Sequence, residues 1–215
     1  MSLWHNLLMN DFSKRALDII EAGRTLYQMG LVPATSGNFS ARLADDNIAI
    51  TVSGRHKGRL TEADIMIIDA GGAPFDTRRP SAETGLHTQI YNHYPEVNAI
   101  LHPHSMNAIL LSRRVNDVVV LEDYELLKAF EGIDTHATRI HVPVFGNDQD
   151  IPRLAGKIAQ YLDTHEHVYG YIIAGHGMYT WGRTMADTLR HVEAFEYLFA
   201  CELRTHWNNQ QESLT

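Results

Sequence analysis

Apolar residues recur three and four positions apart in several stretches of the chain, and two of these stretches end at a residue that stops a helix. The first helix is predicted over residues 12–29, where Gly30 ends it. A second is predicted over residues 82–94, with Ser81 as its N-cap and Pro95 as its end. The same spacing predicts helices over residues 105–111, 124–130, 150–162 and 184–207.

Short apolar or β-branched runs between turn residues predict strands that alternate with these helices. Strands over residues 39–43 and 48–52 are separated by the polar turn Asp45-Asp46-Asn47, which predicts a hairpin. Further strands are predicted over residues 65–68, 97–101, 118–120, 139–144 and 169–174. No repeat or linker divides the chain, so we expect an α/β fold in a single domain over residues 1–215, with its core over about 13–207 and a polar tail over 208–215. The expected sheet is mixed, mainly antiparallel and covered by helices.

Net charge, cysteine count and apolar content limit the kinds of partner and the cellular compartment that we expect for this protein. The net charge is -8 and no run of five or more Lys or Arg residues occurs, which argues against a nucleic-acid-binding surface. Cys201 is the only cysteine, so an intramolecular disulfide and a cysteine-ligated zinc site are excluded, which favours a reducing compartment. The chain begins without a leader pattern and lacks an apolar stretch of ~18 residues, so we expect a cytoplasmic protein with no membrane partner.

Three histidines stand at the ends of predicted strands. His102 and His104 lie two positions apart after one apolar strand, so both side chains leave the same side of the backbone. His176 follows another strand between Gly175 and Gly177, which remove side-chain bulk beside it. Three neutral imidazoles with an open position are the ligand set of a catalytic zinc site. The alternative is that these are strand-end histidines with structural hydrogen bonds only.

Four short segments rich in Gly, Ser, Asn and Lys contain donors suited to a phosphate. They are Ser36-Gly37-Asn38, Thr51-Val52-Ser53-Gly54, Arg55-His56-Lys57-Gly58 and Pro80-Ser81. Turn and capping roles explain each one alone, and neither a GxxxxGK[ST] loop nor a GxGxxG motif after a strand is present. If the segments converge, the phosphate ligands are Ser36, Gly37, Asn38, Ser53, Gly54, Lys57 and Ser81.

Two glutamates are candidate catalytic groups. Glu125 follows the histidine pair by about twenty residues and could exchange protons in a metal-assisted enolisation. Its alternative role is an exposed helix carboxylate paired with a nearby lysine. Glu83 lies in the first turn of a predicted helix, where a favourable interaction with the helix dipole is a sufficient explanation.

The order of Ser36-Gly37-Asn38, Thr51-Val52-Ser53-Gly54, Pro80-Ser81-Ala82-Glu83, His102-Pro103-His104 and Gly175-His176-Gly177 resembles the class II aldolase/adducin family. The resemblance covers residues 13–207. It implies a class II aldolase-like α/β sandwich, one Zn2+ per subunit on His102, His104 and His176, and a homotetramer with active sites near subunit interfaces. Pro103 stands where relatives commonly carry Thr, so a hydroxyl contact at that position is lost while the ligand pair is kept.

The resemblance also implies a reaction on a small sugar phosphate. Glu125 matches the acid/base of members that eliminate water, whereas Glu83 falls where aldolases of the family place their catalytic glutamate. Residues 53–58, 124–128, 147–150 and 177–182 favour a zinc-dependent hydro-lyase. The alternatives are a sugar-phosphate aldolase or 4-epimerase with the same zinc site, and an adducin-like interaction module without catalysis.

Overall fold

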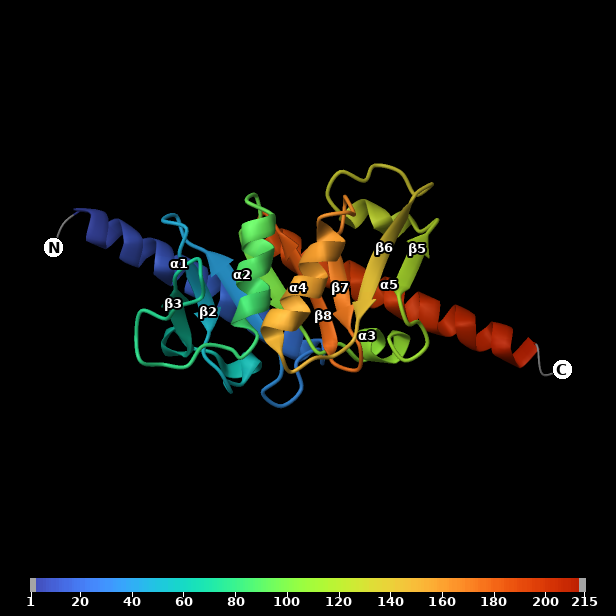
Figure 1. Ribbon diagram of the computed structural model, residues 1–215, viewed down its shortest axis with the longest axis horizontal. Coiled ribbons are helices and arrows are strands. Elements are labelled where there is room, and N and C mark those ends of the chain that lie inside the picture. The colour runs from blue at the N-terminus through green and yellow to red at the C-terminus, as the bar shows by residue number, and fades with distance from the viewer. Residues whose placement is uncertain (1–2, 213–215) are drawn as a thin grey trace.

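The described part of the chain forms one mixed sheet with helices on both faces (Figure 1). The structure is a computed structural model that describes residues 3–212, and the side chains of residues 10–205. Within it eight strands lie in the order β3-β2-β1-β4-β8-β7-β6-β5, and β6–β7 is the one parallel pair among them. The strands are β1 (Asn38–Arg42), β2 (Ile48–Thr51), β3 (Ile65–Ile68), β4 (Ala99–His102), β5 (Val118–Glu122), β6 (Arg139–Phe145), β7 (Gly170–Ile173) and β8 (Gly177–Gly182). The expectation of a mixed, mainly antiparallel sheet is confirmed.

The helices form two layers. The α-helices are α1 (Leu3–Gln28), α2 (Thr84–His93), α3 (Met106–Leu111), α4 (Ile151–Leu162) and α5 (Met185–Glu212), and the short 3-10 helices are η1 (Lys57–Arg59), η2 (Glu62–Asp64) and η3 (Glu125–Ala129). Figure 1 shows α2 and α4 in front of the sheet and α1 and α5 behind it. No helix within residues 3–212 has the length and apolar character needed to cross a membrane.

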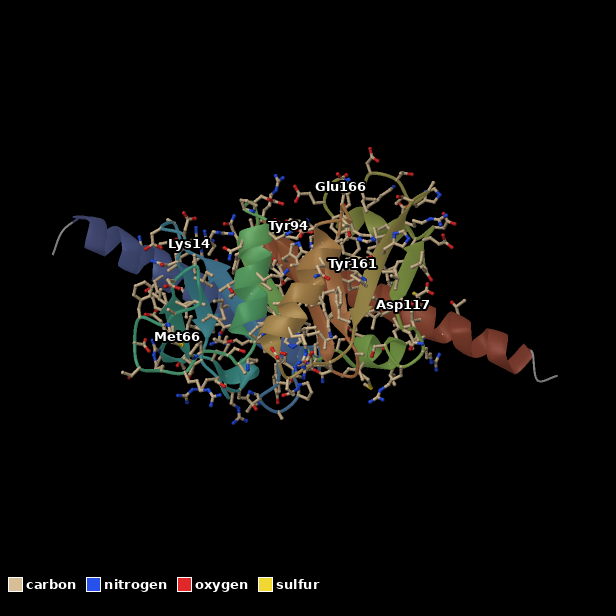
Figure 2. The ribbon with its side chains drawn as sticks, in the orientation of Figure 1. Lys14, Met66, Tyr94, Asp117, Tyr161 and Glu166 are labelled. Atoms are coloured by element: carbon tan, nitrogen blue, oxygen red, sulfur yellow. The ribbon has the colours of Figure 1, made fainter. Side chains whose placement is uncertain are left out.

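Apolar side chains fill the space between the sheet and each helical layer. Leu86 and Ile90 of α2 and Leu154 of α4 are buried against the front face. Tyr161 of α4, labelled in Figure 2, packs edge-on against Phe145 with ring centroids 5.8 Å apart. Behind the sheet, residues of α1 and α5 join the strands in two further apolar clusters. Burial of both faces explains why several strands, among them β4 and β8, have no exposed residue.

The structure corrects four sequence expectations. Residues 177–182 form a strand that the pattern did not predict, because all six residues are buried and no polar alternation marks them. The helix after Ser81 begins at Thr84, so Ser81 is not its N-cap, although its hydroxyl accepts from Glu83 N–H at 3.3 Å. The segment around 124–130 is a 3-10 helix.

The fourth correction concerns the long terminal helices. The first starts at Leu3 rather than at residue 12, and α5 continues to Glu212, past its predicted end at residue 207. The polar tail predicted from residue 208 is therefore helical as far as Glu212, and residues 213–215 of that tail lie outside the described residues.

The segments that contain the candidate site residues lie at one edge of the sheet. β4 and β7 both run antiparallel to β8, so they point the same way, and β6 is parallel to β7. Their carboxyl ends therefore lie at one edge, together with the start of β1 and the end of β2. Loops far apart in the sequence meet there.

Candidate active site

The three predicted histidines converge at this edge. His102 ends β4, His104 follows it, and His176 lies in the turn between β7 and β8. The Nε2 atom of His102 is 3.1 Å from Nε2 of His104 and 3.4 Å from Nε2 of His176. Potential ligand atoms of all three lie within 4.8 Å of one another. The arrangement is a candidate site for a divalent metal ion.

The tautomer of His102 fits metal binding. Its Nδ1–H donates to the carbonyl of Met178 at 2.8 Å, so its Nε2 carries a lone pair and faces the other two rings. Burial lowers the pKa of His104 to about 3 and also lowers the pKa of His176, so both rings are neutral at pH 7. Ligand nitrogens about 2.0–2.1 Å from a tetrahedral zinc ion would lie roughly 3.3 Å apart, close to the spacing here.

Two glycines allow the backbone to come this close. A Cβ atom on Gly177 would lie 2.4 Å from the carbonyl oxygen of Pro103. A Cβ atom on Gly37, which also has a φ of +77°, would lie 2.6 Å from the carbonyl oxygen of His102. Larger residues at either position would push the loops away from the histidines.

Glu83 lies directly beside the histidine cluster. Its Oε2 is 3.2 Å from His102 Nε2, and its Oε1 is 3.4 Å from His176 Nε2. Oε2 also accepts from Asn38 Nδ2 at 2.7 Å and from the hydroxyl of Tyr179 at 3.1 Å. Burial raises the pKa of this carboxyl, but the adjacent His102 and His176 rings and the hydrogen bond from Asn38 outweigh burial and hold the pKa below its usual range. Glu83 is thus an anion with fixed partners rather than a residue that only interacts with a helix dipole.

A cavity of about 570 Å³ opens beside these groups. Glu83, His104 and His176 line it, and so do six of the seven predicted phosphate ligands: Gly37, Asn38, Ser53, Gly54, Lys57 and Ser81. Ser36 is not among the lining residues, although its hydroxyl is buried without a hydrogen-bond partner. Both side-chain groups of Asn38 are already engaged, Nδ2 by Glu83 and Oδ1 by His87.

Lys57 supplies a buried cation in the cavity wall. The residue is 1% exposed, and Nζ donates to the carbonyls of Thr35 at 2.9 Å and Arg55 at 2.7 Å. An ammonium has three donors, so one N–H remains for a ligand. Burial lowers the pKa of Lys57 to about 8, so it is mostly charged at pH 7.

Glu125 lies away from the histidines within one chain. β5 runs antiparallel to β6 and begins just after Asp117, which Figure 2 labels. Its end at Glu122 therefore lies at the sheet edge opposite the cavity, about 17 Å farther along the strand. η3 follows there. The Glu125 carboxylate is exposed, pairs with Lys128 Nζ at 2.7 Å, and borders a different hollow. This Lys128 contact lowers its pKa.

The family profile described as the Class II Aldolase and Adducin N-terminal domain matches residues 17–203. The chain belongs to the class II aldolase and adducin family. Solved structures of this family's fold superpose well. YgbL from Klebsiella pneumoniae, described as a putative aldolase/epimerase/decarboxylase, has a TM-score of 0.76 at 21% identity and covers 88% of each chain. An L-fuculose 1-phosphate aldolase has a TM-score of 0.75 at 22% identity, covering 90% of this chain and 87% of that one.

Two relatives are much more similar in sequence. Methylthioribulose-1-phosphate dehydratase of Methylococcus capsulatus is 67% identical over 91% of this chain and 96% of the relative. The protein with the same description in Hahella chejuensis is 57% identical over 91% of this chain and 95% of the relative. This class II aldolase family member is therefore similar to dehydratases along nearly its whole length.

Sequence reasoning missed several residues at this class II aldolase site. Tyr179 stacks on His102 with ring centroids 4.0 Å apart and donates to Glu83. Residues 147–149, after β6, line the cavity. Both segments contribute to the family resemblance, which assigns neither of them a role. For Tyr179, the missing signal was the unpredicted strand β8.

Proposed function

We propose that this protein is a methylthioribulose-1-phosphate dehydratase, a hydro-lyase of methionine salvage. It removes one water from 5-methylthioribulose 1-phosphate to give 2,3-diketo-5-methylthiopentyl 1-phosphate. The 67% identity with the Methylococcus capsulatus protein, over almost all of both chains, carries the proposal. The cavity supports it, because a candidate metal site, an ionised carboxylate and a buried cation line the same cavity.

The metal proposed for His102, His104 and His176 is one zinc ion. When bound, it would act as a Lewis acid on the oxygens at C2 and C3 of the substrate, which acidifies the C3 proton. In the same cavity, Lys57 and the donors of residues 53–54 bind the C1 phosphate. Binding energy at the phosphate then holds the reacting carbons in register with the histidines.

The proton steps need a carboxylate that can both take and give a proton. Elimination takes the proton from C3 and gives a proton to the hydroxyl that leaves C4, so the acid formed in the first step serves the second. We assign this role to Glu125. Within one chain it lies at the far sheet edge, so it acts in the cavity of a second copy of the chain. The predicted homotetramer with sites near its interfaces would provide that copy.

Retro-aldol cleavage or 4-epimerisation is the second candidate. The observation that favours it is the position of Glu83, whose oxygens lie 3.2 and 3.4 Å from ring nitrogens of His102 and His176. A base placed there could take the proton of a C4 hydroxyl, which breaks the C3–C4 bond. The non-catalytic adducin-like module is a weaker candidate, because an interaction module does not need three converging histidines.

One incubation separates these functions. Purified zinc-loaded protein is mixed with 5-methylthioribulose 1-phosphate, and products are followed by mass spectrometry. Loss of one water supports the dehydratase, two carbon fragments support an aldolase, and a new stereoisomer of unchanged mass supports an epimerase. No reaction with fully loaded protein would favour the interaction module. Zinc-free protein serves as the control.

A further inference from the structure

A chain of buried polar groups leads from the interior to Glu83. It lies between α2 and β1, where Glu83, the N-cap of α2, is followed at four-residue spacing by His87 and Tyr91 on one side of the helix. Asn38 and Ser40 stand two positions apart on β1 and face the same way. His87 is 0% and Ser40 0% exposed, so no water competes for these contacts.

Each link of this chain is a hydrogen bond. Tyr91 and Ser40 hydroxyls are 2.9 Å apart, and Ser40 Oγ is 2.7 Å from His87 Nδ1. His87 Nε2 contacts Asn38 Oδ1, and Asn38 Nδ2 donates to Glu83 Oε2 at 2.7 Å. The proposed function gives no role to His87, Ser40 or Tyr91.

The carboxylate fixes the direction in which the hydrogen bonds run. An ionised Glu83 only accepts, so Asn38 must turn its amide N–H toward it and its carbonyl toward His87. That carbonyl also only accepts, so His87 must carry its proton on Nε2. Burial lowers the pKa of His87 to about 3, so the ring is neutral, and its Nδ1 accepts from Ser40. With the opposite tautomer, either Asn38 or His87 would present a lone pair to another lone pair.

We propose that His87 is a positioning residue for Glu83: through its Nε2–H it holds the Asn38 amide with N–H toward the carboxylate. Without that donor the amide is free to rotate, and its oxygen would repel the carboxylate. Oε2 is then released from one of its donors, and Oε1 no longer keeps its place beside His176 at the cavity wall. The inference rests on Glu83 being used at the site of the proposed function.

The tautomer can be measured without any turnover. Zinc-loaded protein with nitrogen-15 histidine gives ring nitrogen shifts and couplings that distinguish the two tautomers, and His87→Gln identifies the signal of His87. The expected result is a neutral ring protonated on Nε2 across pH 6–8. A ring protonated on Nδ1, or a mixture of the two tautomers, would overturn the proposal even in a fully active enzyme. If the enzyme lacks dehydratase activity, this measurement still decides the proposal.

Kinetics test the consequence. Gln can donate to Asn38 from nearly the same place as Nε2, whereas Leu cannot. His87→Leu is expected to lower kcat at least about tenfold with KM within about threefold, and His87→Gln to restore kcat to within about threefold of wild type. The matched control is His191→Leu. His191 is a buried histidine of α5 that bonds to the Trp181 carbonyl, so its replacement should leave kcat unchanged.

Zinc content and thermal melting are measured on all three variants. Equal loss of kcat in His87→Leu and His87→Gln, or no loss in either, contradicts the positioning role. If His87→Leu does not fold, His87→Phe replaces it. This variant keeps a buried aromatic ring but has no donor for Asn38 Oδ1, so it should lower kcat as His87→Leu would; a kcat equal to that of His87→Gln contradicts the proposal.

Discussion

Replacing Lys57 with Met separates two effects of the buried ammonium: its effect on the free energy of unfolding and its effect on substrate binding. Burial lowers the pKa from 10.5 to about 8, so keeping the ammonium charged costs the folded state about 3 kcal/mol. Met removes that cost but leaves the carbonyls of Thr35 and Arg55 without their donor, at about 1–3 kcal/mol each. The two effects oppose each other, so near pH 7 the free energy of unfolding should change by no more than about 3 kcal/mol.

The pH dependence of stability measures the contribution of the Lys57 charge separately from that of its hydrogen bonds. The unfolded lysine keeps its proton up to about pH 10.4, while the folded one loses it near 8. Between these values the unfolded state binds more protons, so the stability of the wild type rises with pH. Relative to Lys57→Met, the wild type should gain up to about 3 kcal/mol from pH 7 to 10.5 in urea unfolding. Parallel stability curves for the two proteins would show that Lys57 is not a strained buried cation.

Substrate affinity should respond in the opposite sense. Removing one member of a buried charge pair costs about 2–5 kcal/mol. Lys57→Met is therefore expected to raise KM for 5-methylthioribulose 1-phosphate by roughly 30-fold or more, with a smaller change in kcat. The KM of the wild type should also rise above pH 8 as Lys57 loses its proton, and that of the variant should not. An unchanged KM in the variant would refute Lys57 as a phosphate ligand.

Three further predictions concern metal and protons. Alanine at His102, His104 or His176 should release zinc and abolish turnover; full zinc content in all three variants, by elemental analysis, contradicts the ligand set. Glu125→Gln should keep zinc and lose turnover, and Glu83→Gln should be milder; the reverse order of kcat values supports the aldolase-like base. Mixing subunits of Glu125→Gln with those of His102→Ala should restore part of the activity, and no recovery in confirmed hybrids argues against a shared site.

Local patterns were enough for most of the fold. The hairpin of β1 and β2 appears as predicted around Asp45-Asp46-Asn47, because its turn residues and apolar runs act at short range. β8 was missed because both its faces are covered by helices, which leaves no polar alternation to detect. The predicted start of α2 was wrong. Serine is a common N-cap residue, but here Ser81 accepts from Glu83 N–H in the turn before the helix, which begins at Thr84.

From the sequence, only those parts of the candidate site that lie at the ends of predicted strands could be placed. His102 and His104 share a side of the backbone by their spacing alone, and His176 needed the further inference that two strands end at one edge. The contact between Glu83 and His102 depends on how α2 lies on β1, which no local pattern contains. The separation of Glu125 from the histidines follows from the strand order, and this too was beyond the pattern of single elements.

Helical and strand periods together explain why Glu83 has so many fixed partners. Four-residue spacing from the N-cap Glu83 into α2 brings Glu83, His87 and Tyr91 to one side. Two-residue spacing on β1 brings Asn38 and Ser40 opposite them. An unpaired buried polar group costs about 1–3 kcal/mol, so a substitution at any link leaves its neighbours unsatisfied. The chain of hydrogen bonds is thus maintained as a unit, and the orientation of the carboxylate beside the histidines is built into the packing of one helix on one strand. Among the described residues, the exposed Glu125 carboxylate contacts only side chains at the surface, Lys128 at 2.7 Å and His136 at 3.7 Å. The two glutamates therefore differ: the fold of one chain fixes Glu83, whereas the proposed role of Glu125 depends on the proposed assembly with a second copy.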